Sequence, residues 1–117
     1  MRVPSDLFTV RVKRSTGTAR LRLKGRFDEA AVETLDALIG VLRHRDVTMD
    51  LEGITFMDTA GWLGVMAYER RVRDWGKDVR LENVPEHVRR IFELTATDRL
   101  LVQPWARERL ARSGGSQ

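Results

Sequence analysis

The chain has 117 residues, of which 42% are hydrophobic and 32% charged, so it has the size of one ordinary domain with enough apolar material for a core. The absence of cysteine excludes disulfides, thiolate catalysis and cysteine-based metal sites, and the apolar runs fall far short of the ~20 residues that a membrane span needs. The net charge of +4 invites a nucleic-acid-binding interpretation, but acidic residues stand among most of the basic ones, which is typical of solvated surfaces.

The N-terminal region predicts a short tail followed by a β-hairpin. Residues 1–6 lack the apolar stretch of a signal peptide, so we expect a cytoplasmic protein without membrane insertion. Residues 8–12 and 19–23 alternate apolar and polar side chains as half-buried strands do, and turn-forming residues separate them at 15–18. Gly25 is expected to close the second strand.

A helical period replaces the alternation from about Glu29. Asp28 stands just before this helix, where its side chain can accept hydrogen bonds from free backbone N–H groups. Residues 47–51 then predict a strand, and residues 54–57 form a second short apolar run. The stripe that marks the buried side of the helix consists of Val32, Leu35, Leu38, Ile39 and Leu42.

A second helix is predicted from about Ala60 to Trp75, with Gly76 as a natural stop. Its apolar residues form a broad surface, whereas Glu69, Asp74 and the neighbouring arginines are expected on a solvated face. The apolar set comprises Leu63, Val65, Met66, Ala67, Tyr68, Val72 and Trp75.

The rest of the chain predicts a strand at residues 79–84 and a third helix whose first position is Pro85. Residues 98–102 continue this region briefly. Residues 105–112 predict a short terminal helix, and residues 113–117 are expected to be disordered. The buried side of the third helix is expected to consist of Val88, Ile91, Phe92 and Thr95.

The resulting order, β-β-α-β-α-β-α, predicts an α/β fold in a single domain. A mixed sheet of four to five strands is expected, with the helices packed mainly on one side and right-handed crossovers between parallel strands. We expect the domain to span residues 7–103, between a tail at 1–6 and a C-terminal region at 104–117.

Residues 48–64 carry the most specific pattern of the chain. A strand ending in Asp-Leu is followed by a short link, a hydrophobic pair and Asp-Thr-Ala-Gly, which opens a helix at residues 58–61. This segment resembles the signature of STAS domains, the family of anti-sigma factor antagonists (anti-anti-sigma factors). Residues 25–28, Gly76 and residues 80–95 resemble further parts of the family's pattern in the same order.

The resemblance implies a role in bacterial transcription regulation by partner switching. In the family, the hydroxyl residue after the aspartate is phosphorylated by a partner serine-protein kinase that is also the anti-sigma factor, and by position that residue is Thr59. The dephosphorylated form binds the anti-sigma factor and releases the sigma factor, phosphorylation blocks this binding, and a phosphatase reverses it. The resemblance therefore implies a phosphoprotein that is not an enzyme and needs no cofactor.

The chemistry around Thr59 is compatible with a phosphate apart from the family. Its hydroxyl is predicted at a helix N-terminus, where it can cap the helix and where free N–H groups and the helix dipole favour a phosphate. Asp58 and Asp28 are expected to lie close to that phosphate and to shape the field around it. The same segment is also an ordinary N-cap sequence, and taken alone it leaves both interpretations open.

The exposed start of the second helix is the predicted partner surface, made of Ala60, Gly61, Trp62 and Leu63. Trp62 stands where the family often has leucine or isoleucine. It either anchors a partner, since tryptophan is enriched at interface hot spots, or packs in the core, and the sequence leaves both open.

Other functions are represented by weaker signals. Some STAS domains are subunits of transport systems, including lipid-transport complexes, so docking on a transporter ATPase without phosphorylation is the alternative. Nucleic-acid binding through the arginines is a remote alternative, because no groove-reading motif is present. His44 and His87 are expected at the surface, and neither a metal-binding spacing nor a phosphate-binding loop is found in the sequence.

Overall fold

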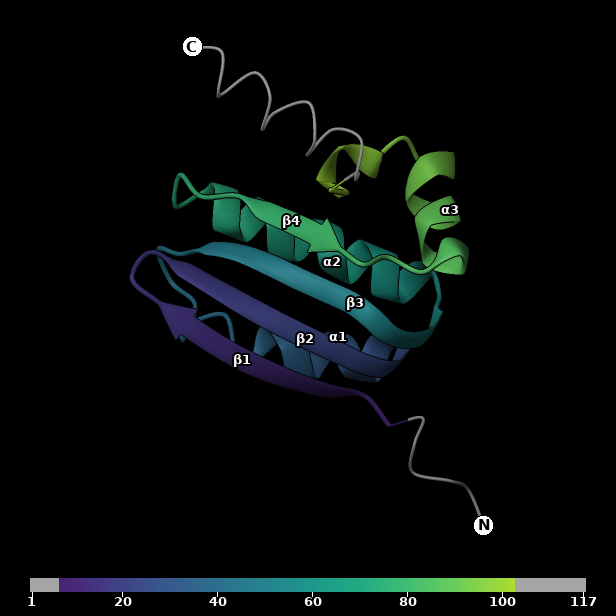
Figure 1. Cartoon of the computed structure of the whole chain (residues 1–117), viewed down its shortest axis with the longest axis horizontal. Helices are drawn as coiled ribbons and strands as arrows, with labels where there is room; N and C mark the ends of the chain where they lie inside the picture. Colours follow the sequence, from purple (N-terminus) through teal and green to yellow (C-terminus); the bar gives the residue numbers. More distant parts are fainter. Residues whose placement is uncertain (1–6, 103–117) are drawn as a thin grey trace.

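The computed structural model describes residues 7–102 of the chain, and the predicted tails and the predicted helix at 105–112 lie outside them. The described part follows the predicted order of strands and helices (Figure 1). Its elements are β1 (Thr9–Ser15), β2 (Thr18–Phe27), α1 (Glu29–Asp36), β3 (Asp46–Met57), α2 (Thr59–Arg73), β4 (Val79–Glu82), α3 (Glu86–Leu94) and the 3-10 turn η2 (Asp98–Leu100).

The four described strands form one mixed sheet in the order β1-β2-β3-β4, which confirms the predicted architecture. β1 and β2 are an antiparallel hairpin, whereas β2, β3 and β4 run parallel. Parallel neighbours need a crossover, and α1 and α2 supply the two crossovers. Both helices lie on the same face of the sheet, behind it in the view of Figure 1, and no described helix covers the opposite face.

The core lies between the sheet and these two helices. Alternate residues of β2 and β3 are buried because successive side chains of a strand point to opposite faces. Burying a leucine or phenylalanine completely stabilises the fold by roughly 1.5–3 kcal/mol. Tyr68 of α2 is fully buried as well, and this burial raises the pKa of its phenol well above the ordinary value. The fully buried side chains include Leu21, Leu23, Phe27, Leu35, Leu42, Met49, Leu51, Val65, Leu81, Val88 and Phe92.

The sequence predicted that the second strand ends at Gly25, but the strand continues to Phe27. Gly25 has a φ of 93°, and the register against β3 shifts on both sides of it. Glycine adopts such a positive φ without steric cost, so the residue creates an irregularity within the strand instead of its end. The extension carries the strand to the residue that precedes Asp28.

The first helix is shorter than its apolar stripe predicted. It ends at Asp36, and turns whose N–H groups bond three residues back, such as Leu38 to Leu35 and Ile39 to Asp36, follow it. Leu42 is nevertheless fully buried, so the stripe predicted the buried residues better than the helix.

The other predicted elements differ in smaller ways. The two apolar runs at 47–51 and 54–57 belong to a single twelve-residue strand. Pro85 is the N-cap of α3 rather than its first residue, and Thr95 is exposed, with its hydroxyl donating to the carbonyl of Ile91 at 2.7 Å. Within residues 7–102 no helix combines the length and the apolar character that crossing a bilayer demands.

Candidate functional site

The starts of α1 and α2 lie side by side at one edge of the sheet. Phe27 and Met57 are register partners at the carboxyl ends of the parallel strands β2 and β3, which are neighbours about 4.8 Å apart. The next residues of the chain, Asp28 and Asp58, therefore leave the sheet together. The structure thus brings the two predicted carboxylates to the same edge.

Each of these carboxylates caps its own helix. Asp28 Oδ1 accepts a hydrogen bond from the backbone N–H of Ala31 at 3.2 Å, as the sequence predicted. Asp58 Oδ1 accepts one from the N–H of Gly61 at 2.9 Å. The second oxygen of Asp28 lies 3.8 Å from Nε of Arg26, which compensates part of its charge. Both helices thus begin with a fixed negative charge.

Gly61 packs where the start of α2 meets the end of β2. A Cβ atom added at this position would collide with the backbone carbonyl oxygen of Phe27 and lie 3.1 Å from Cγ of Met57. Gly64, one turn later, packs in the same manner against the side chain of Val32 in α1. The close approach of the two helix starts depends on these glycines, and Gly61, predicted as a partner contact, is buried in that packing.

Thr59 is the first residue of α2 and is exposed. The sequence predicted that its hydroxyl can cap the helix, but Asp58 is the N-cap instead. Asp58 has an extended backbone, and its carboxylate accepts the hydrogen bond from the Gly61 N–H. Among the residues that the structure describes, none forms a hydrogen bond with the Thr59 side chain. The exposed hydroxyl therefore has no hydrogen-bonding role among residues 7–102.

Trp62 is half-buried and packs against the core. Its indole Nε1 donates to the hydroxyl of Thr97 at 3.1 Å, which ties the start of α2 to the segment after α3. The sequence left open whether this side chain anchors a partner or packs inside, and the structure gives it packing and a polar partner. Ala60 is half-buried too, while Leu63 is 53% exposed.

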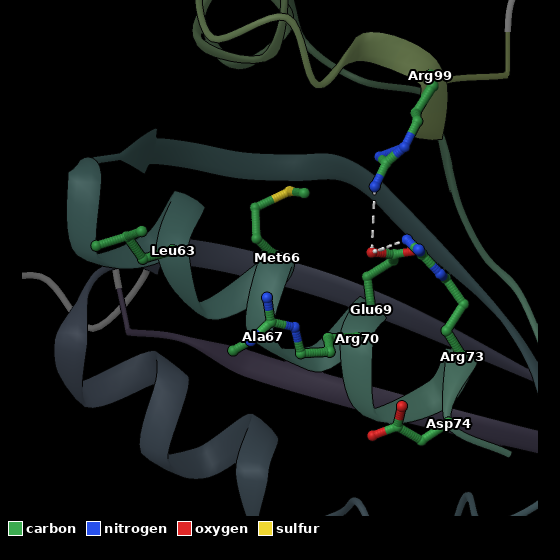
Figure 2. Close-up of a pocket in the computed structure, with 8 residues that line it drawn as sticks. All are labelled: Leu63, Met66, Ala67, Glu69, Arg70, Arg73, Asp74 and Arg99. Carbon is green, nitrogen blue, oxygen red and sulfur yellow. Dashed lines mark hydrogen bonds and ion pairs between the residues drawn. The ribbon is translucent and has the colours of Figure 1, made fainter.

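A shallow groove follows the exposed side of α2 beyond Leu63. Figure 2 shows Leu63 and Met66 at one end and a cluster of charged side chains at the other. Arg99 reaches from η2 towards Glu69 in this view. The lining residues are Leu63, Met66, Ala67, Glu69, Arg70, Arg73, Asp74 and Arg99.

Glu69, one of these lining residues, is buried, whereas the sequence predicted that it lies on a solvated face. Its carboxylate accepts hydrogen bonds from Arg73 at 3.0 Å and from Arg99 at 3.4 Å. The first partner stands four residues along the same helix and could have been inferred from the sequence. The second comes from η2, thirty positions further along the chain, so only the fold reveals it.

The described residues form no cluster suited to a metal ion. Across residues 7–102 no three histidine, aspartate or glutamate side chains are arranged to hold a metal ion. His44 and His87 are both exposed, and His44 packs against the ring of Trp75 with a centroid distance of 5.8 Å. The exposed Thr59, the paired helix starts and the groove along α2 therefore make up the candidate site.

Comparison with known proteins connects this arrangement to a family. A family model described as "Mlab, STAS domain" matches residues 10–103. No curated protein sequence matches the chain.

Several solved structures share the fold. The anti-sigma factor antagonist SpoIIAA in its unphosphorylated form superimposes with a TM-score of 0.73 at 22% identity, covering 92% of this chain and 97% of that one. Phosphorylated SpoIIAA from Bacillus gives 0.69 at 21% identity, with coverages of 90% and 99%. An anti-sigma factor antagonist from Mycobacterium paratuberculosis gives 0.73 at 20%, with coverages of 95% and 97%.

The same fold also occurs within a membrane transporter. A segment of the murine Slc26a9 anion transporter superimposes with a TM-score of 0.59 at 15% identity, covering 69% of this chain but only 14% of the transporter. At such identities the likeness establishes a common fold.

Proposed function

We propose, from the premise that this chain belongs to the STAS domain family, that it acts as an anti-sigma factor antagonist. Its dephosphorylated form binds an anti-sigma factor of the serine-protein kinase type, and this binding releases the sigma factor. Phosphorylation of Thr59 blocks the contact, and a phosphatase restores it. The observation that carries the proposal is the exposed Thr59 hydroxyl at the start of α2, which has no partner among the described residues.

The electrostatics of the helix start explain how one phosphate would act as a switch. A phosphate adds about −1.5 to −2 charges next to the two capping carboxylates, Asp28 and Asp58. The N-terminus of α2 would hold this group, since its first N–H groups and its dipole favour anions. An acidic partner surface would then be repelled. A cost of about 3 kcal/mol weakens binding roughly 100-fold.

The contact surface of this proposal runs from Thr59 along the exposed side of α2. Leu63 offers an exposed apolar side chain, and the groove beyond it adds Met66 and charged groups at its far end. Trp62 and Gly61 contribute by fixing the position of this surface, because their own contacts are mostly internal. The protein performs no chemistry of its own, and its partner supplies the ATP-dependent step.

The proposal is tested by capturing the partner kinase from the native host and incubating it with the chain and Mg-ATP. Mass spectrometry should find one phosphate, located on Thr59. Thr59→Ala should bind the partner but resist phosphorylation, whereas Thr59→Glu should bind at least ~10-fold more weakly. Thr34→Ala, an exposed threonine in α1, is the matched control and should behave like the wild type. If Thr59→Ala and Thr59→Glu both bind as tightly as the wild type, Thr59 is not a switch.

A second function is docking on a transporter ATPase as an unphosphorylated subunit. The occurrence of this fold within the Slc26a9 anion transporter supports a role in a transport system. The same helix start would then be a permanent docking surface. The captured partner distinguishes the two functions: it would be a transport ATPase, and no phosphate would be transferred to Thr59.

A further inference from the structure

The open face of the sheet gathers basic side chains that are scattered in the sequence. In β2, Arg20, Arg22 and Lys24 alternate with buried residues. Because successive side chains of a strand point to opposite faces, these three point away from the helices. Register partners of an antiparallel pair share a face, so Arg11 lies opposite Arg22 and Lys13 opposite Arg20. The basic residues of this face are Arg11, Lys13, Arg20, Arg22, Lys24, Arg26 and Arg80.

The acids of this face lie on the far strands and leave the β1 side positively charged. Asp50 of β3 lies 3.2 Å from Arg20, and Glu82 of β4 lies 2.9 Å from it, a hydrogen bond that raises the pKa of Arg20. Arg11 and Lys13 form no ion pair with any residue from 7 to 102. Like charges placed directly opposite each other destabilise a strand pair. The β1 side is therefore suited to receive negative charge.

The outer edge of β1 adds a second property to this side. β1 is an edge strand of the sheet, and in the described part of the chain no strand pairs with its outer side. Its other face carries Val10 and Val12, opposite Leu23 and Leu21, and Val12 is 38% exposed. A chain lying along this edge would meet basic residues on one face and valines on the other.

We propose that the β1 edge binds an extended acidic segment of a partner protein, in which acidic and apolar residues alternate. Main-chain hydrogen bonds to β1 would add the segment to the sheet as a fifth strand, as in β-strand addition. Its carboxylates would lie beside Arg11 and Lys13 and its apolar residues beside Val10 and Val12. The spacing matches, since alternate residues of both strands lie about 6.6–6.8 Å apart. This surface is independent of Thr59 and of the function proposed above.

Two other occupants fit the edge less well. A second copy of the chain would bring Arg11, Lys13 and Arg14 against the same residues of its partner, and such like-charge pairs protect natural edge strands from self-association. A nucleic acid would find the ring of Phe56 already covered by Arg26, whose Cζ lies 4.1 Å from the ring centroid, and this flat face presents no helix to a groove.

Binding of a fluorescent peptide of alternating glutamate and valine residues, measured by anisotropy, tests the proposal. A peptide of the same composition with glutamates and valines in two blocks is the comparison. We expect saturable binding of the alternating peptide, at least ~10-fold weaker binding of the block peptide, and NMR amide shifts confined to β1 and β2. The double variant Arg11→Glu/Lys13→Glu should bind the peptide about 10-fold more weakly or worse, because the peptide's glutamates would then face glutamates instead of basic residues.

The matched control is Arg43→Glu/Arg90→Glu, which makes the same change in net charge at two exposed positions away from β1. It should bind the peptide like the wild type. Equal losses in the two double variants, or amide shifts on α2 instead of β1, would overturn the proposal. So would tighter binding of a single-stranded oligonucleotide than of the peptide, or a dimer in light scattering that the peptide does not dissociate. An unchanged unfolding midpoint of both variants excludes misfolding as the cause.

Discussion

The two ends of α2 are held in place by different interactions. At its start, the helix touches the backbone of β2 through Gly61, and the carboxylate of Asp58 fixes the first turn. Towards its end, the side chain of Glu69 connects to Arg73 and Arg99 through charged hydrogen bonds. Backbone contacts tolerate almost no change of volume, whereas long arginine side chains can move into water. The start of α2 is therefore the more rigid end, and it is the end that presents Thr59.

The largest effect that separates the two ends is expected from Gly61→Ala. The new Cβ would collide with the carbonyl oxygen of Phe27, which cannot move without distorting β2, so we expect a loss of about 3 kcal/mol or more in the free energy of unfolding. Urea denaturation measures this loss. Gly40→Ala is the control, because a Cβ there meets no atom within 4 Å, and equal stability of the two variants would contradict the assigned packing.

The next effect concerns the far end of the helix. Arg73→Ala/Arg99→Ala would leave the carboxylate of Glu69 buried without a partner, and we expect this to cost about 3 kcal/mol or slightly less. Adding Glu69→Met to this double variant should restore most of the lost stability, because an apolar side chain of similar length needs no partner. Urea denaturation of the double and triple variants checks this, and a triple variant as unstable as the double would show that the arginines act by packing.

A smaller effect is expected from removal of the cap at the start. Asp58→Ala should lower the free energy of unfolding by about 1 kcal/mol, since the N–H of Gly61 loses its acceptor. Asp58→Asn keeps an oxygen that can accept this hydrogen bond and should stay close to the wild type. Thermal unfolding of the two variants, compared at one pH, measures the difference. Equal losses would mean that charge matters more than the capping bond.

The smallest effect is expected from Thr59→Ala, the variant that also tests the switch. Because the Thr59 side chain forms no hydrogen bond within the described part of the chain, stability should change by less than about 0.5 kcal/mol. Denaturation of this variant provides the measurement. A loss as large as that of Asp58→Ala would show that the hydroxyl supports the helix, and would weaken the case for a residue reserved for modification.

The sequence was sufficient to predict the order of strands and helices and the pairing of Asp28 with the start of α1. These features depend on local patterns: a period of two or of about 3.6 residues and a capping side chain just before a helix. The residues of the STAS signature predicted the family, which the match over residues 10–103 confirms. Local sequence patterns thus predict the features that depend on residues close together in the chain, such as strands, helices and their caps.

Features that depend on distant residues could not be predicted in the same way. The alternation of β2 marked Arg20 and Arg22 as exposed, but only the register with β1 places Lys13 and Arg11 opposite them. Glu69 resembled a surface residue because its second partner, Arg99, lies on another element. Gly25 was interpreted as a strand end because its effect on the register is visible only once β3 lies beside it.

The indole of Trp62, held in place by its hydrogen bond to Thr97, is a fluorescent probe at the start of α2. Tryptophan emission shifts to longer wavelength when water gains access to the ring, and this ring stands three positions after Thr59, half-buried at the helix start. A partner that covers the beginning of α2 should therefore shift the emission to shorter wavelength. Replacing Trp75 and Trp105 by phenylalanine would isolate this signal, so that docking could be followed in real time without an attached dye.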